Sequence, residues 1–238
     1  NWPDAEFPLP MRDLTVDVHI ENQVARVAVD QTFFNPQAAT LEGAYRFPLP
    51  ADASIARLAM YVDGTRMDAA VVERTQGRRI YESIVYQRRD PALLEWMNGN
   101  LFQLRIFPLP GRTEKRVALQ YTQSLERLYG DYQLAVPIPE VDEPVAHVRF
   151  QARLVGCASC AITSTSHAVE RSSDGDDAIV SFERSGYRIG DDLLLTVHEP
   201  AAGSRIARYH GPRHDYLLWR AQPEIGASVG GAAPGPRR

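Results

Sequence analysis

Near its beginning the chain reads Leu14-Thr15-Val16-Asp17-Val18-His19-Ile20, with an apolar side chain at every second position. Successive side chains of a β-strand point to opposite faces, so this period of two predicts a strand with one buried face. The same alternation returns in residues 102–106, 117–121 and 146–154, and we expect later strands over 178–183, 193–198 and 216–220. Repeated half-buried strands predict a mainly β protein with antiparallel sheets.

Turn sequences separate these runs and predict hairpins. Asp63-Gly64, Asn98-Gly99 and Asp174-Gly175 each stand between neighbouring apolar runs. Asn-Gly and Asp-Gly pairs adopt the backbone conformations that tight hairpin turns require. Because short strands with frequent turns favour two packed sheets, we expect an antiparallel β-sandwich.

One segment, residues 77–87, departs from the strand pattern. Its apolar residues are Ile80, Tyr81, Ile84 and Val85. This spacing gives one apolar stripe and predicts a short amphipathic helix packed on a sheet. Pro91 is expected to prevent the helix from continuing.

The string Phe-Pro-Leu-Pro occurs three times, beginning at Phe7, Phe47 and Phe107, and a near copy begins at Val136. Proline lacks the N–H that a sheet ladder needs, so each copy is expected to end a strand at a sheet edge. A ligand for a groove that binds proline-rich segments is the alternative. Strand termination is favoured because the Phe and Leu side chains are expected to be buried.

The composition limits the function. The chain has 238 residues, enough for one large β domain or two small ones. Its net charge of -4 gives no electrostatic basis for binding nucleic acid. The sequence contains no apolar run of about 18 residues, the length that a membrane-spanning helix needs. Lys115 is the one lysine among 26 basic residues. We attribute this bias to a GC-rich bacterial genome; a specific use of the arginine fork is the alternative.

Several short motifs follow one another in a recognisable order. They read Gln31-Thr32-Phe33-Phe34-Asn35-Pro36, Leu41-Glu42-Gly43-Ala44-Tyr45-Arg46-Phe47-Pro48-Leu49-Pro50, Arg79-Ile80-Tyr81-Glu82, Ala92-Leu93-Leu94-Glu95-Trp96, Phe107-Pro108-Leu109-Pro110 and Val117-Ala118-Leu119-Gln120-Tyr121. Together they resemble the vault protein inter-alpha-trypsin (VIT) domain across residues 9–128. The resemblance implies a β domain for protein interaction or scaffolding, with no catalytic residue to carry over.

The same resemblance implies a layout for the rest of the chain. VIT domains usually precede a von Willebrand factor A domain, and residues 129–221 look like the β-rich segment that joins the two. Residues 222–238 are rich in Gly, Ala and Pro and are expected to be a flexible linker. The A domain needs an Asp-x-Ser-x-Ser metal site. The nearest string, Asp52-Ala53-Ser54-Ile55-Ala56, lacks the last hydroxyl and is rejected as a metal site.

The two cysteines are spaced as Cys157-Ala158-Ser159-Cys160. A thiol redox motif needs a helix N-terminus to lower the thiol pKa, and no helix signal follows this one. We therefore expect a turn with two buried or locally bridged sulfurs. The sequence leaves open whether they are bridged.

Other candidates for catalysis or metal binding are weak. Asp174-Gly175-Asp176-Asp177 lacks the later ligands of a calcium loop and is interpreted as a hairpin turn. His210 and His214 have helical metal-ligand spacing, but Gly211-Pro212 breaks a helix between them, so surface loop residues are expected. Ser164, Ser166 and His167 lack the Gly-x-Ser-x-Gly elbow of a hydrolase. We expect no catalytic residue, no cofactor and no metal site.

The surface that we predict to bind a partner is a cluster of basic and aromatic residues that flanks the predicted helix. Arginine and aromatic side chains together are typical of protein interfaces. A solvated helix face with local ion pairs, such as Arg78 with Glu82, is the alternative. The predicted partner-binding residues are Arg78, Arg79, Tyr86, Arg88, Arg89 and Trp96.

The function that we expect is that of a non-catalytic interaction or scaffold module of a larger, exported bacterial protein. Its partner would be another protein or the adjacent A domain. Bacterial relatives of this layout are often held at the envelope, which implies an extracytoplasmic location, either periplasmic or at the cell surface. Two other classes stay open: a glycan-binding adhesion module, in which Trp96 would stack on sugar, and a thiol oxidoreductase that uses Cys157 and Cys160.

Overall fold

The structure, a computed structural model, describes residues 9–62, 65–68, 70–71, 92–96, 101–128, 130–138, 141–199, 205–211 and 214–220. The chain forms two compact units, Asn1–Glu199 and Pro200–Arg238. Every regular element in the described ranges is a β-strand. Within those ranges no helix has the length and apolar character needed to cross a membrane.

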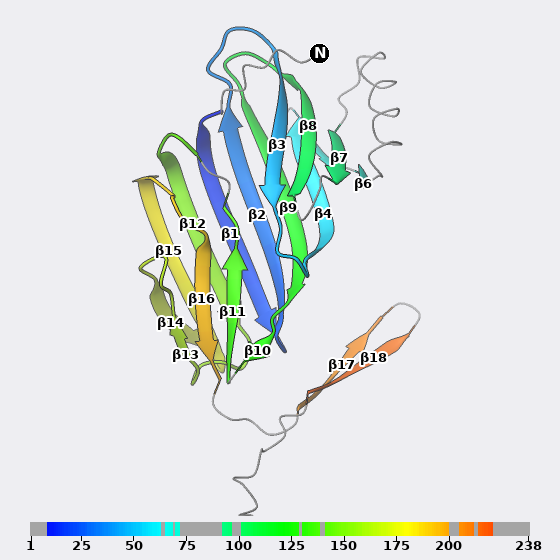
Figure 1. The fold of residues 1–238 in the computed structure, drawn as a ribbon, viewed down its shortest axis with the longest axis vertical. Coiled ribbons are helices and arrows are strands. Elements are labelled where there is room, and N and C mark those ends of the chain that lie inside the picture. The colour runs from blue at the N-terminus through cyan, green and yellow to red at the C-terminus, as the bar shows by residue number, and fades with distance from the viewer. Residues whose placement is uncertain are drawn as a thin grey trace, which may run out of the picture. The chain divides into compact units, whose positions relative to one another are not determined.

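The first unit is organised around an eight-stranded sheet (Figure 1). Its strands are β1 (Met11–Glu21), β2 (Val24–Phe34), β4 (Ser54–Val62), β5 (Thr65–Asp68), β9 (Glu114–Ser124), β12 (Val145–Leu154), β14 (Glu170–Asp174) and β15 (Asp177–Tyr187). They lie in the order β14-β15-β12-β1-β2-β9-β4-β5. All neighbours are antiparallel except β1 and β12, which run parallel with Val16 opposite Phe150.

Two four-stranded sheets cover one face of this large sheet (Figure 1). One contains β3 (Leu41–Pro48), β6 (Ala70–Val71), β7 (Ala92–Trp96) and β8 (Leu101–Leu109), in the order β3-β8-β7-β6. The other contains β10 (Arg127–Leu128), β11 (Asp131–Val136), β13 (Ala161–Thr163) and β16 (Leu193–His198), in the order β10-β11-β16-β13. One hydrophobic cluster holds buried side chains from all three sheets, among them Phe150, Leu104 and Leu134.

This architecture corrects the predicted fold class. The sheets do not form the expected antiparallel sandwich, because the parallel pairing of β1 with β12 joins strands from both halves of the chain into one mixed sheet. The described ranges also contain no helix. The segment 77–87, for which a helix was predicted, lies outside them. Four apolar residues in a short segment are too few to identify a helix by periodicity alone.

The alternating pattern correctly predicted strand β1 and its buried face. Leu14, Val16, Val18 and Ile20 are all buried in β1, whereas Asp17 between them is exposed. The buried residues of β12 belong to the same cluster as those of β1. The two β regions therefore share one core, a question that the sequence had left open.

The predicted turns are borne out where the structure describes them. Strands β4 and β5 pair up to Val62 and Thr65, on either side of Asp63-Gly64. Strands β14 and β15 pair up to Asp174 and Asp177, and Gly175 has a φ of +61°. This left-handed conformation favours glycine because it has no Cβ. Strands β7 and β8 are likewise antiparallel neighbours.

The proline motifs lie near strand ends, and one of them is hydrogen-bonded to the side chain of Asn35. Strands β3, β8 and β11 end at Pro48, Leu109 and Val136, so these copies end strands as expected, whereas the first Phe-Pro-Leu-Pro copy precedes β1. The expected edge position is correct for β3 and wrong for β8 and β11, which each have a neighbour on both sides. The Asn35 side-chain amide donates to the carbonyl oxygens of Ala39, Leu109 and Pro110 at 3.1, 2.9 and 3.1 Å. Nearby, a Cβ on Gly111 would lie 2.2 Å from the Ala38 carbonyl oxygen. Asn35 thus joins two motifs that are far apart in sequence.

The second unit contains a two-stranded antiparallel sheet, formed by β17 (Arg205–His210) and β18 (Asp215–Arg220). The predicted strand over 216–220 lies within β18. His210 ends β17, which corrects its expected place in a surface loop. Its ring Nδ1 lies 2.8 Å from Asp215 Oδ1.

Candidate functional site

In the acidic turn from Asp174 to Asp177, the carboxylates of Asp174 and Asp177 are hydrogen-bonded to other groups of the protein. The carboxylates of Asp174 and Asp177 each accept a hydrogen bond from Arg153 at 2.6 Å. Asp177 also accepts the backbone N–H of Gly156 at 2.9 Å. The Gly156 N–H and the Arg153 guanidinium hold the pKa of Asp177 below its ordinary value. These contacts give the carboxylates a structural role in the turn. Among the described residues no cluster of three or more His, Cys, Asp or Glu could hold a metal ion.

The two cysteines form a disulfide within a tight turn. Cys157 and Cys160 are bridged and only 2% and 3% exposed, and the Cys160 N–H donates to the Cys157 carbonyl at 3.0 Å. The backbone N–H of Ala158 donates to Asp176, and Arg171 donates to the Ala158 carbonyl. These bonds fasten the turn to the β14–β15 hairpin. A thiol oxidoreductase needs an accessible sulfur, and this arrangement does not offer one.

The Ser-His pair at residues 166–167 is part of the packing. Ser166 Oγ lies 2.8 Å from His167 Nδ1 and accepts the Leu194 N–H at 2.9 Å. The His167 ring stacks on Phe182 at a centroid distance of 5.1 Å. Burial lowers the pKa of His167, while the carboxylate of Asp191 acts in the opposite direction. His167 is therefore a buried, stacked ring, and the contacts of Ser166 are those of a structural side chain.

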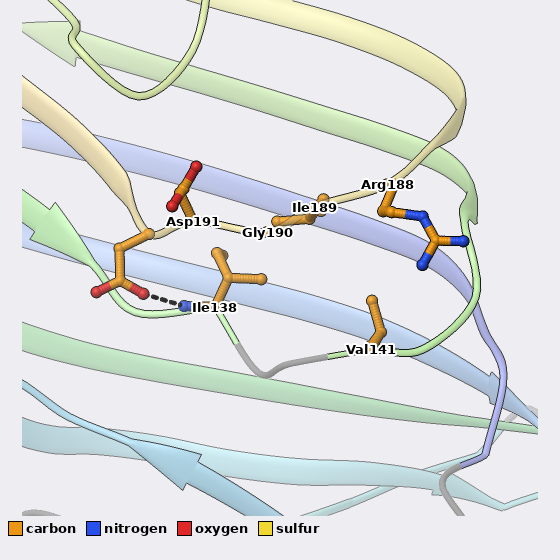
Figure 2. A pocket seen from close by; sticks show the side chains of 7 residues that line it. Ile138, Val141, Arg188, Ile189, Gly190 and Asp191 are labelled. Atoms are coloured by element: carbon orange, nitrogen blue, oxygen red, sulfur yellow. Dashed lines mark hydrogen bonds between the residues drawn. The ribbon is translucent and has the colours of Figure 1, made fainter.

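A surface hollow of about 420 Å³ is lined by two connections between strands of the first unit (Figure 2). The connection from β11 to β12 contributes Ile138 and Val141 to its lining. The connection from β15 to β16 contributes residues 188–192, which include Arg188 and the carboxylates of Asp191 and Asp192. The lining of the hollow thus combines apolar and charged residues.

Hydrogen bonds hold the two connections together. The Ile138 N–H donates to Asp192 Oδ1 at 3.1 Å (Figure 2). The Arg188 guanidinium donates to the Asp142 carbonyl at 2.7 Å. Asp191 differs, since it forms no hydrogen bond or salt bridge with any residue that the structure describes. Its exposed carboxylate is therefore available to a charge from outside.

A second hollow, of about 230 Å³, adjoins the first because both are lined by Val141. Its other lining residues are Leu9, Pro10, Met11, Asp142 and Glu143. We call the two hollows together the acidic groove. Its described lining carries four carboxylates, those of Asp142, Glu143, Asp191 and Asp192, against the single guanidinium of Arg188.

The β17–β18 hairpin presents a different kind of surface. Ile206, Leu217 and Trp219 are 71, 72 and 69% exposed, and Tyr216 is 59% exposed. Ile206 lies opposite Trp219, and Leu217 opposite Arg208, so these four share one face, whereas Tyr216 and Leu218 point to the other. Apolar side chains are thus exposed on both faces of a two-stranded sheet.

The predicted partner-binding residues are not tested by this structure. Arg78, Arg79, Tyr86, Arg88 and Arg89 lie outside the described residues. Trp96 ends β7 with its backbone opposite Phe102, and the position of its side chain is not described. The sequence patterns predicted neither the acidic groove nor the exposure of the hairpin. A signal for the hairpin was present in the four consecutive apolar residues from Tyr216 to Trp219.

Comparisons with known proteins match the part of the chain that contains the six motifs. The family model of the vault protein inter-alpha-trypsin domain matches residues 11–121. The human von Willebrand factor A domain-containing protein 5A is 27% identical over 139 residues, which are 58% of this chain and 18% of that protein. The human inter-alpha-trypsin inhibitor heavy chain H6 is 29% identical over 120 residues, which are 50% of this chain and 9% of that protein. The match spans less than a fifth of either relative.

Among solved structures, a Legionella pneumophila protein described as a nutrient binding protein has a similar fold. Its TM-score is 0.58 at 10% sequence identity, over 80% of this chain and 67% of that chain. At this identity the similarity concerns the fold alone.

Proposed function

Because residues 11–121 of this chain are a vault protein inter-alpha-trypsin domain, we propose that the chain is a non-catalytic module for protein interaction within a larger protein. The observation that carries the proposal is the apolar surface of the β17–β18 hairpin, where Leu217 is 72% and Trp219 is 69% exposed. Exposed apolar side chains that lie together on a surface are typical of protein–protein contact sites.

The low stability expected of an isolated hairpin also favours a contact with a partner. An isolated two-stranded sheet is marginally stable in water, because it cannot bury an apolar face by itself. The hairpin has apolar side chains on both faces, with Trp219 and Leu217 on one and Leu218 on the other. A folded partner that covers one face would remove this apolar surface from water.

The partner that we propose is an adjacent von Willebrand factor A domain. The name of one similar human protein states that it contains such a domain. In this proposal the chain is a scaffold and its β17–β18 hairpin is the surface that contacts the A domain. The predicted limits of the VIT-like domain, the β-rich segment and the linker, at 9–128, 129–221 and 222–238, belong to the same proposal.

The location and origin are proposals as well. We propose an extracytoplasmic place in a bacterial cell, supported by the Cys157–Cys160 disulfide, since disulfides persist in oxidising compartments. The near absence of lysine supports a GC-rich bacterial source. Fractionation of the native host tests the location. The protein is expected with periplasmic or surface markers, and recovery with cytoplasmic markers would contradict the proposal.

A second contact surface stays a prediction: Arg78, Arg79, Tyr86, Arg88, Arg89 and Trp96. Reversal of the charges at Arg78, Arg79 and Arg88 is expected to weaken partner capture without a change in the thermal midpoint of unfolding. Unchanged capture by the folded triple variant would remove this surface from consideration.

The hairpin proposal is tested by site-specific photocrosslinking in the natural full-length protein. A photoreactive amino acid at Leu217 is expected to crosslink to an A domain of the same polypeptide, identified by mass spectrometry. The control position is Ser172 in β14, which is also exposed in a strand but carries a polar side chain. Equal crosslinking from both positions, or none from Leu217, would overturn the assignment of the hairpin as the contact surface.

A further inference from the structure

The acidic groove has a chemistry that the hairpin lacks. Its floor contains half-buried Leu9, Ile138 and Val141, which pack against the core from outside. Ile189 completes the first hollow and is 4% exposed. Half-buried apolar side chains on the floor of a groove can still lose water when a ligand side chain covers them.

The charges along the groove are strongly unequal. Asp142 and Glu143 line the second hollow, whereas Asp191 and Asp192 line the first. Arg188 is the single cation in the described lining, and its guanidinium already donates to the Asp142 carbonyl. Like charges in a groove with low-dielectric walls reinforce one another, so this groove attracts cations.

Two of the charged groups also fix the shape of the groove. Asp192 accepts a hydrogen bond from the Ile138 N–H, and Arg188 donates one to the Asp142 carbonyl. These two bonds connect the β11–β12 and β15–β16 connections to each other. Asp191 and Glu143 have no such bond among the described residues. Asp192 and Arg188 therefore stabilise the shape of the groove, whereas the carboxylates of Asp191 and Glu143 are available to a ligand.

From these features we infer that the acidic groove binds a partner peptide segment in which an apolar side chain is flanked by lysine or arginine. The apolar side chain lies on the floor formed by Ile138, Val141 and Ile189. The flanking cations lie against Asp191 at one end and Glu143 at the other. The occupant is a peptide because a single cation would leave the apolar floor uncovered. This site lies in the first unit and is independent of the hairpin proposal.

The test measures binding of synthetic peptides to the whole chain by NMR titration at low salt. The probe has the sequence Ala-Lys-Leu-Lys-Ala with blocked ends. Two control peptides replace its lysines by glutamate or its leucine by serine. The probe is expected to shift the amide signals of Val141 and Gly190, and both control peptides are expected to bind at least threefold more weakly. Rising salt is expected to weaken binding of the probe, because exposed charges are screened.

Variants separate this groove from the rest of the surface. Asp191→Asn and Glu143→Gln remove charge from groups that form no described bond, so both proteins are expected to fold. Each is expected to weaken binding of the probe about threefold, in line with the strength of exposed ion pairs. Asp17→Asn is the matched control, because Asp17 is exposed on β1 outside the groove; it should leave binding unchanged.

Several outcomes would overturn the inference. They are equal binding of the glutamate peptide, equal loss in the Asp17→Asn control, and no shift at Val141 and Gly190. Titration with calcium chloride alone is the remaining arm. If calcium shifts the same signals and the peptide does not, the groove is a cation site and the peptide assignment is wrong. None of these results bears on crosslinking from Leu217, so failure here is distinguishable from failure of the proposed function.

Discussion

Strands β12 and β18 use similar residues for opposite purposes. In β12, Val148 and Phe150 are each 1% exposed, because β1 and β15 flank the strand and the smaller sheets contribute to the same core. In β18, Leu217 is 72% and Trp219 is 69% exposed, because β17 is its single strand neighbour. Strand-forming residues therefore do not determine by themselves whether a strand stabilises a core or offers a surface. The number of covering layers determines it.

The largest expected effect is that of a truncation in the shared core. Phe150→Ala should lower the free energy of unfolding by about 3–5 kcal/mol, because it removes a buried ring and leaves a cavity. Urea denaturation of the whole chain measures the change. Since Phe150 lies opposite Val16 across the parallel pair, the loss should appear in the unfolding of β1 as well as β12. A loss confined to residues after 129 would contradict a common core.

A smaller loss is expected at the loop that Asn35 organises. Asn35→Ala removes the amide that donates to three carbonyls, and we expect a destabilisation of about 2–3 kcal/mol because two of these bonds lie at the end of a core strand. Gln37→Ala is the control, since the side chain of Gln37 is exposed and its backbone N–H is retained. Similar midpoints of denaturation for the two variants would show that the Asn35 bonds are dispensable.

The disulfide should contribute less. It closes a short loop, with a sequence separation of 3, and chain-entropy arguments give about 1–2 kcal/mol for such a bridge. The double variant Cys157→Ala, Cys160→Ala is expected to fold and to lose this amount in thermal or urea denaturation. A thiol assay on the native protein, without reductant, is expected to find no free sulfhydryl. Rapid reaction of both sulfurs in the folded protein would instead revive the oxidoreductase alternative.

A modest pH dependence should arise from His167. Burial lowers its folded-state pKa below the ordinary value of 6.5, so the unfolded chain binds the proton more readily than the folded one. Stability from this group is therefore present above pH 6.5 and is lost as the pH falls from there through the folded-state pKa. His167→Phe keeps an aromatic ring on Phe182 and should reduce the loss of stability between pH 7.5 and pH 5.5. An identical loss in wild type and variant would exclude His167 as its source.

The smallest effect on stability is expected in the hairpin. Leu217→Ser and Trp219→Ser should change the free energy of unfolding by no more than about 0.5 kcal/mol, because both side chains are largely exposed. The same substitutions should strongly reduce crosslinking to the partner, measured from a photoreactive residue at Ile206. Destabilisation as large as that of Phe150→Ala would mean that the hairpin is part of the core.

The sequence predicted the strands well because alternation is local. The pattern through Leu14 and Ile20 and the turn at Gly175 each depend on neighbouring residues, and both agree with the structure. The parallel pairing of β1 with β12 was not predicted, because a period of two identifies a buried face and not its partner. That pairing converts the expected sandwich into one large mixed sheet with two smaller sheets on it.

The candidate surfaces were harder to predict for a related reason. The acidic groove is assembled from two connections, which meet through Ile138 and Asp192. No short motif contains both. Cys157 and Cys160 were expected in a turn from the missing helix signal, and their bridge became evident only from the structure. The partner-binding residues from Arg78 to Arg89 lie outside the described residues and stay a prediction.

Hydrogen exchange of the whole chain tests the central claim most directly, because it reports the stability of each strand in one experiment. We expect the amides of β1 and β12 to exchange together, with the highest free energy of opening in the molecule, and those of β17 and β18 to exchange much earlier. Separate opening of β12 and β15 while β1 and β2 stay protected would contradict a core shared by both halves of the chain. If the amides of the β17–β18 hairpin were as protected as those of β1 and β12, the assignment of the hairpin as an exposed partner-binding surface would be contradicted.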